Sequence, residues 1–185
     1  MLRLAALLLL ILFIPIARGQ TIPQPIRLCV AIPQSSSWQI VKPAWQQKEL
    51  TRALERSNKN EDVKKGATAR IQPVGLRSTS TAELDMQVRN CGFILYTSLA
   101  KVQMGKPQAG LPPPRVWHDA TVNYRILRAD NPKWCVSGVV SARDTVSEQT
   151  LVSRLMEQIA TGVATEVRTL HSGGAHGFSS SDCSQ

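Results

Sequence analysis

Residues 93–102 read FILYTSLAKV, the most apolar stretch of the chain after its first 19 residues, and the neighbouring elements follow from it. An apolar run of this length with aromatic residues predicts a buried strand. Residues 80–91 predict a helix, because Ser80 and Glu83 form a capping box in which each side chain satisfies a backbone N–H group. Gly92 ends that helix, so the chain enters the strand directly.

Two further strands precede that helix. Residues 26–32 read IRLCVAI between prolines, which predicts a buried strand. Residues 68–76 predict a second strand, with Pro73 at an edge or a bulge. Residues 44–57 predict a helix between them, and residues 58–66 predict a charged loop. Strands joined through helices become parallel neighbours with right-handed crossovers, so these strands are expected to be parallel.

Downstream, residues 121–128 and 134–142 alternate apolar and polar side chains, which is typical of half-buried antiparallel strands. Residues 103–114 are rich in Gly and Pro and predict a loop. The closing helix covers 146–170, with Ser147 as its cap. One apolar face runs along this helix: Leu151, Val152, Leu155, Met156, Ile159, Ala160, Val163 and Val167. A face this broad must cover the sheet or form an interface.

The element order is therefore β-α-β-α-β-β-β-α. It predicts an α/β fold, a mixed five-stranded sheet with helices packed on it. Residues 26–170 are expected to form a single domain, which is long enough to bury a core. Residues 171–185 are rich in Gly, Ser and His, which predicts a disordered tail.

The chain begins with the features of a Sec-type signal peptide. Arg3 precedes an apolar run, and Ala17-Arg18-Gly19 offers a small-residue cleavage site. We therefore expect residues 1–19 to be removed and residues 20–25 to form an extended leader. The protein is then periplasmic or secreted, with no membrane span after cleavage. An uncleaved amino-terminal anchor is the alternative.

The remaining chain is basic and contains four cysteines. Arg3 and Arg18 leave with the signal peptide, so 20 of the 22 basic residues remain against 13 acidic ones, a net charge of +7. This balance favours acidic partners, and export argues against nucleic acid. Cys29 and Cys91 fall at the same end of neighbouring strands, so we expect Cα atoms within about 7 Å and a possible disulfide. Buried free thiols are the alternative.

The sequence contains no catalytic, cofactor or metal motif. It lacks G-x-S-x-G, H-E-x-x-H, the phosphate loop and G-x-G-x-x-G, and its cysteines match no zinc spacing. We interpret His118 and Asp119 as an exposed polar pair at the start of a strand, because a site needs groups that converge in a pocket. No catalytic, cofactor-binding or metal-binding residue is predicted, and the protein is expected not to be an enzyme.

Two features of the first half predict partner binding. A basic stripe lies within about 80° on the first helix, opposite its apolar side: Lys48, Arg52, Arg56 and Lys59. Trp38 lies in the loop after the first strand, at the end of the sheet where ligands of open α/β sheets bind, and Trp45 flanks that loop. The alternatives are a solvated helix face and tryptophans that pack on the domain.

The order of the elements and the segment CGFILYT, residues 91–97, together resemble CsgG/LpoB/TolB-amino-terminal-like periplasmic envelope proteins. That group includes the curli secretion-channel lipoprotein and outer-membrane activators of penicillin-binding proteins. The resemblance covers residues 26–170 and implies a non-enzymatic binding or scaffolding domain. The chain lacks the lipobox cysteine and a pair of amphipathic hairpin segments, so a secretion pore is not expected.

The expected function is therefore a non-enzymatic exported interaction or scaffolding module. Its partner would be an envelope protein or an anionic envelope polymer, and its oligomeric state stays open. One alternative is a small periplasmic hydrolase or carbohydrate-active enzyme, which convergent carboxylates or a Cys–His pair would favour. Another is a binder of anionic wall polymer or lipid through the basic helix face.

Overall fold

A computed structural model of the chain describes residues 24–35, 41–65, 69–77, 81–105, 116–131 and 135–172. The predicted signal peptide, Trp38, Ser80 and the chain beyond residue 172 lie outside these described residues. The elements follow in the order β1 (Ile26–Val30), β2 (Gln34–Ser35), α2 (Pro43–Lys65), β3 (Ile71–Gly75), α3 (Thr81–Val88), β4 (Phe93–Met104), β5 (His118–Arg128), β6 (Cys135–Asp144) and α4 (Glu148–His171).

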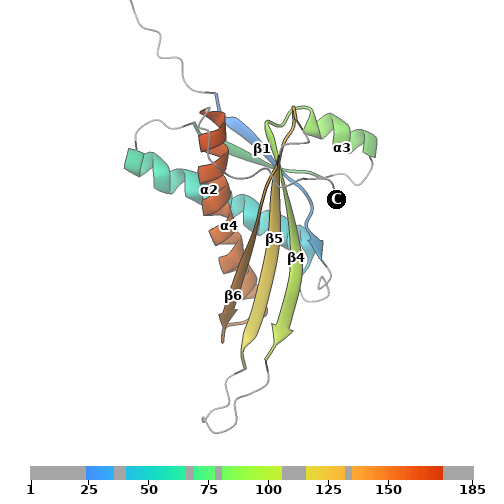
Figure 1. The fold of residues 1–185 in the computed structure, drawn as a ribbon, viewed down its shortest axis with the longest axis vertical. Helices are drawn as coiled ribbons and strands as arrows, with labels where there is room; N and C mark the ends of the chain where they lie inside the picture. The colour runs from blue at the N-terminus through green and yellow to red at the C-terminus, as the bar shows by residue number, and fades with distance from the viewer. Residues whose placement is uncertain are drawn as a thin grey trace, which may run out of the picture.

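The strands form one mixed sheet in the order β3-β1-β4-β5-β6 (Figure 1). β1 pairs in parallel with both β3 and β4, and β4, β5 and β6 are successively antiparallel. The predicted mixed five-stranded sheet is thus confirmed. The two-residue strand β2 was not predicted. It pairs with β4 at Ser98 and Leu99, beyond the point where β1 ends, so it continues the row of β1 along β4.

The main core lies between the sheet and the two helices that cover one of its faces, α2 and α4 (Figure 1). All eight residues predicted for the apolar face of α4 are buried, together with Ala164. Ser147 caps the helix as predicted, because its side chain accepts a hydrogen bond from the N–H of Thr150. The closing helix therefore covers the sheet, and it also packs against α2.

Helix α2 is longer than predicted. The sequence interpretation ended it near residue 57 and made residues 58–66 a loop, but the helix continues to Lys65. Residues 58–65 contain Lys and Glu but no Gly or Pro, so helix propensity allows this continuation. Asn58 also anchors it, because its Nδ2 donates to the carbonyl oxygen of Ile71 at 2.6 Å. Charge alone was therefore a poor sign of a loop.

The other element boundaries differ from the predicted ones by one to three residues, which is the usual uncertainty of helix and strand ends. The largest extension has a clear cause. β4 runs on to Met104 and pairs there with His118, so β5 begins three residues earlier than its alternating pattern suggested. No helix among the described residues combines the length and apolarity of a membrane span.

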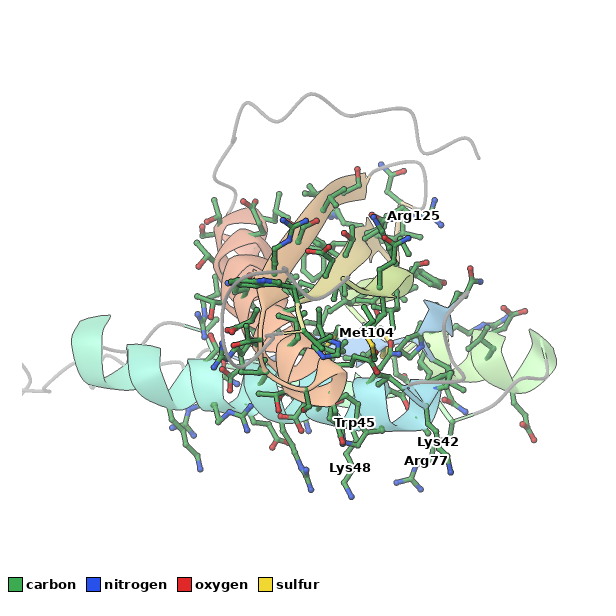
Figure 2. All side chains as sticks on the ribbon, turned by 90° about the horizontal axis from the view of Figure 1, so that it is seen from below. Lys42, Trp45, Lys48, Arg77, Met104 and Arg125 are labelled. Atoms are coloured by element: carbon green, nitrogen blue, oxygen red, sulfur yellow. A yellow bond between two sulfur atoms is a disulfide. The ribbon has the colours of Figure 1, made fainter. Side chains whose placement is uncertain are left out.

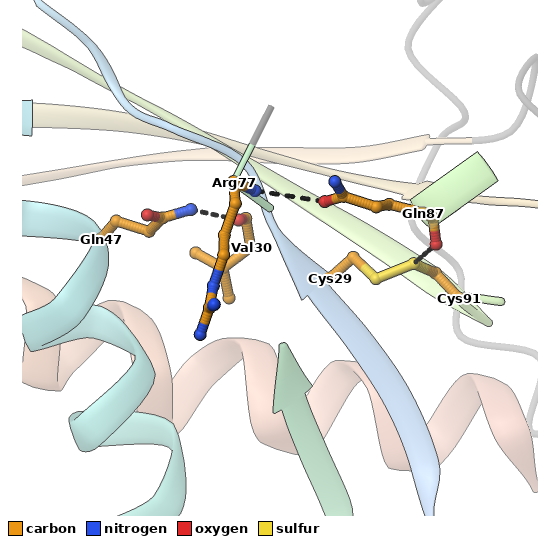
Figure 3. Close-up of a disulfide and its surroundings, with 6 residues drawn as sticks. All are labelled: Cys29, Val30, Gln47, Arg77, Gln87 and Cys91. Atoms are coloured by element: carbon orange, nitrogen blue, oxygen red, sulfur yellow. Dashed lines mark hydrogen bonds between the residues drawn. A yellow bond between two sulfur atoms is a disulfide. The ribbon is translucent and has the colours of Figure 1, made fainter. Parts of the chain in front are cut away.

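Helix α3 packs on the opposite face of the sheet over a smaller apolar cluster. Cys29 of β1 and Cys91 form a disulfide within this cluster, with Cα atoms 5.8 Å apart (Figure 3). The bridge joins β1 to the segment that leads from α3 into β4. Close by, Gln87 of α3 accepts a hydrogen bond from the backbone N–H of Arg77 at 3.1 Å, so α3 is also tied to the end of β3.

Candidate functional site

The described residues cover the second face of the sheet only in part. α3 lies at one end of the sheet (Figure 1), and its cluster covers β1, β3 and the start of β4. Side chains alternate between the two faces of a strand, so residues that do not join the main core on β4, β5 and β6 point to this second face. Six of them stand in two cross-strand rows, Tyr96–Arg125–Ser137 and Ser98–Asn123–Val139. We call this surface the open sheet face.

A groove of about 640 Å³ lies on the open sheet face, and we call it the sheet groove. The two rows line it, together with Ile32, Gln34, Thr97, Tyr124 and Gly138. Two large hydrophobic side chains of the groove are exposed: Ile32 is 38% exposed and Val139 is 66% exposed. A groove with both apolar and amide or hydroxyl side chains suits a ligand that combines apolar and hydrogen-bonding groups.

Arg125 gives the groove its charge. Its guanidinium carbon lies 5.7 Å from the centroid of the Tyr96 ring, within reach of a cation–π contact. No carboxylate of the described residues lines the sheet groove. The groove therefore carries a positive charge that an anionic group of a ligand would complement.

Tyr124 and Gly138 lie beneath the groove, because the Tyr124 side chain packs against the main core on the other face of the sheet. A Cβ atom at position 138 would lie 2.5 Å from the Tyr124 hydroxyl oxygen, so the phenol ring occupies the space that any side chain there would need. Burial raises the pKa of Tyr124 because it disfavours the phenolate, and the negative charge of Glu166 on α4 raises it further. Tyr124 is therefore a neutral, positioned side chain at ordinary pH.

Farther along β5 and β6, the open sheet face carries an ion pair. Arg143 donates to both carboxylate oxygens of Asp119, at 2.5 and 3.1 Å. This hydrogen bond lowers the pKa of Asp119. His118 and Asp119 do begin β5, but the expectation that both are exposed was wrong. Both are half-buried, and the Nδ1 atom of His118 lies 3.4 Å from a carboxylate oxygen of Glu148.

The sheet groove contains serine, threonine and tyrosine residues, but no described carboxylate or imidazole accompanies them as a general base. The part of the chain that the structure describes contributes no aspartate, glutamate, histidine or cysteine to its lining. Within the described residues, no cluster of His, Cys, Asp and Glu side chains could hold a metal ion. The groove can bind through apolar contact, hydrogen bonds and one cation, but its own side chains offer no proton-transfer pair.

The structure separates the two predicted tryptophans. Trp38 lies outside the described residues. Trp45 is half-buried and packs against the main core, and Figure 2 shows it near the start of α2. Trp45 thus follows the alternative in which the tryptophan packs on the domain, and it attaches the start of α2 to the core.

The predicted basic stripe lies on the exposed side of α2, but part of its charge is neutralised. Lys48, Arg52, Arg56 and Lys59 are all exposed. Arg52 lies 3.7 Å from a carboxylate oxygen of Glu49, and Arg56 binds both Glu49 and Glu157 of α4, at 3.2 and 3.0 Å. Arg56 therefore contributes to helix packing as much as to an outward charge.

A different basic cluster was missed. Lys42, Lys48 and Arg77 point away from the protein on the same side (Figure 2), around the start of α2 and the end of β3. None of the three pairs with a described carboxylate. We call this the basic cluster. Helical periodicity could not reveal it, because Lys42 precedes the helix and Arg77 comes from a different element.

The comparisons with known proteins bear on the fold. No protein-family model matches the chain, and no curated protein sequence matches it. Among solved structures, hypothetical protein CT253 from Chlamydia trachomatis matches with a TM-score of 0.51 and 11% identity, over 77% of this chain and 98% of that one. The PelC dodecamer from Paraburkholderia phytofirmans matches with a TM-score of 0.50 and 9% identity, over 74% of this chain and 86% of that one.

A lipoprotein from Neisseria meningitidis is more distant, with a TM-score of 0.40 and 12% identity, over 76% of this chain and 99% of that one. At these identities the first two matches show a shared fold and nothing more specific. The resemblance to CsgG/LpoB/TolB-amino-terminal-like proteins stays a prediction.

Proposed function

We propose that the protein is a non-enzymatic exported module that binds an envelope protein in the sheet groove. The observation that carries this proposal is the sheet groove, which no described element covers, with exposed Val139 and Ile32 beside the cation of Arg125. An exposed apolar surface rimmed by polar groups is typical of protein-binding sites. The segment bound there would present apolar side chains and a carboxylate.

The location rests on separate observations. The first 19 residues have the pattern of a signal peptide, and a Cys29–Cys91 disulfide fits an oxidising compartment. We propose a periplasmic or secreted protein that begins at Gln20. Mass spectrometry of the exported protein should show a chain without residues 1–19. An intact amino terminus in the membrane fraction would contradict cleavage.

The binding proposal can be tested by photo-crosslinking in cells. A photoreactive amino acid at Asn123 of the groove should capture a defined envelope protein, and the same group at Thr165, exposed on α4, is the control. Arg125→Glu should strongly reduce the adduct from position 123, because it reverses the charge of the groove. Equal adducts from both positions, or an adduct indifferent to Arg125→Glu, would contradict the groove as the binding site.

The basic cluster supports a second candidate, a binder of anionic envelope polymer or lipid. Lys42, Lys48 and Arg77 add charge at the start of α2, and the first turn of that helix contains no acidic residue. Sedimentation with vesicles of anionic lipid should then be salt-dependent. Lys48→Glu with Arg77→Glu should abolish it, whereas Arg125→Glu should not. Binding that survives the double change would exclude this candidate.

A further inference from the structure

The outer edge of β6 borders the sheet groove and presents a row of backbone groups that the groove does not use. β6 is the last strand of the sheet, and it pairs with β5 over ten residues. Along such a strand, every second residue directs its N–H and C=O groups away from the partner strand. No described residue makes a hydrogen bond to this outer row of backbone groups. The row is therefore a ready template for another strand.

Sequence features that normally block such an edge are missing from β6. Residues 136–142 read VSGVVSA, with no charged residue and no proline. Natural edge strands are usually protected by charges, prolines, bulges or shortness. The charges of β6 come at its end, where Arg143 pairs with Asp119 and Asp144 pairs with Arg154. Val139 in the middle of the strand is the most exposed large hydrophobic residue among those described.

We propose that β6 pairs antiparallel with β6 of a second copy of this chain, across a two-fold axis through Val139. Residues directly opposite each other must share a face, so Val139 would lie opposite Val139 of the second copy, and Ser137 opposite Ser141. The pairing buries the exposed valine and continues the sheet into the second copy. It extends the proposed function, because Ser137 and Val139 also line the sheet groove, so the two grooves would lie side by side.

Charge favours a second copy in this antiparallel arrangement. Arg143 and Asp144 lie at the same end of β6, so antiparallel pairing places the two copies' charges at opposite ends of the joint strand pair. No like charges then face each other, whereas parallel pairing would set Arg143 beside Arg143 of the second copy. The uncharged residues 136–142 of the two copies would face each other without charge repulsion. A strand pair alone buries less surface than a permanent dimer needs, so the association is reversible and depends on concentration.

Cysteine cross-linking tests the pairing and its register. The background is the purified protein with Cys135→Ser and Cys183→Ser, which keeps the Cys29–Cys91 bridge. Val139→Cys should give a covalent dimer under mild oxidation, because the Cα atoms of opposed residues lie about 4.5–5.5 Å apart. Ser137→Cys alone should not, because its copies would be about four residues apart along the strand pair. Ser137→Cys with Ser141→Cys should restore the covalent dimer.

A charge variant tests whether the edge drives association in solution. Analytical ultracentrifugation of the protein from micromolar to millimolar concentration should show a monomer–dimer equilibrium. Val139→Lys should weaken it at least about tenfold, because two lysines would face each other at the axis. Ile32→Lys is the control, since it places the same charge in the sheet groove but away from β6.

The outcomes are distinct. Dimers that depend on Val139 and cross-link in the stated register support the proposal. A monomer at all concentrations overturns it, and so does a dimer that Val139→Lys leaves intact. Binding in the sheet groove is read separately, through the adduct from Asn123 and its dependence on Arg125. The groove can therefore fail while the edge pairing holds, and the reverse.

Discussion

The two edges of the sheet, β3 and β6, are built in opposite ways. On β3, the carbonyl of Arg70 and the N–H of Leu76 face β1, so the odd-numbered residues between them face outward. Asn58 of α2 pairs with both outward groups of Ile71, with contacts of 2.6 and 3.1 Å, as a neighbouring strand would. Pro73 has no N–H to offer at the next outward position.

Helix α4 reinforces this closed edge. Arg168 donates to the Asn58 side-chain oxygen at 2.8 Å and to the carbonyl of Ala69 at 3.3 Å. β6 has no such cover from the described residues, and its residues 136–142 contain no charged residue and no proline. Among the described residues, side chains therefore occupy the edge of β3 but not the edge of β6, and the pairing that we propose uses the edge of β6. The variants below test that contrast, in order of decreasing effect.

The largest loss of stability is expected from a substitution in α4, the helix that packs on the sheet. Leu155 of α4 is fully buried, so Leu155→Ala should lower the free energy of unfolding by about 2–5 kcal/mol. Gln158→Ala, at an exposed position of the same helix, is the control and should cost little. Urea denaturation measures both. If Leu155→Ala left the midpoint unchanged and only altered self-association, α4 would be an interface and not part of the core.

Asn58→Ala should open the closed edge. It leaves the N–H and C=O of Ile71 and the guanidinium of Arg168 without this partner, which should cost about 1–3 kcal/mol. Asn58→Asp keeps the oxygen that the Ile71 N–H and Arg168 bind but sets a second oxygen against the carbonyl oxygen of Ile71, so it should also lower stability. A stability unchanged by Asn58→Ala would show that the side chain does not close the edge of β3.

Residues that act within one element were predictable from sequence. The apolar face of α4 and the alternation of β5 and β6 follow from periods of 3.6 and 2, and the Ser147 cap follows from the residue types that begin helices. The contacts of Asn58 were not, because its partners lie 13 and 110 residues away along the chain. The rows of the sheet groove could not be predicted for the same reason, since each row joins residues of three strands that are distant in sequence.

Gly138→Ala tests how closely Tyr124 of β5 packs against the backbone of β6. The added Cβ would displace the Tyr124 ring, and because that ring is the end of a side chain that can swing, the expected cost is about 1 kcal/mol. Replacing Tyr124 by Leu should remove most of this cost. A thermal denaturation cycle with both single variants and the double variant checks it. Equal costs in both backgrounds would mean that Tyr124 does not set the requirement for glycine.

A smaller effect is expected at high pH. Burial raises the pKa of Tyr124 above its usual value of 10.0, so the folded protein holds this proton to higher pH than the unfolded chain does. The resulting stability is present below pH 10 and is lost as pH rises through the folded-state pKa. Ultraviolet titration of the wild type minus that of Tyr124→Phe should place the Tyr124 midpoint above 10. A midpoint at or below 10 would contradict the burial of its hydroxyl.

Hydrogen exchange at several protein concentrations tests the difference between the two edges most directly. The amide of Ile71 donates to Asn58 within one chain, so its protection should not depend on concentration. The outward amides of residues 136–142 should exchange fast in dilute protein and slow down as the concentration rises, and Val139→Lys should abolish that slowing. If the protection of the β6 amides were the same at every concentration, the proposed pairing of β6 with a second copy would be contradicted.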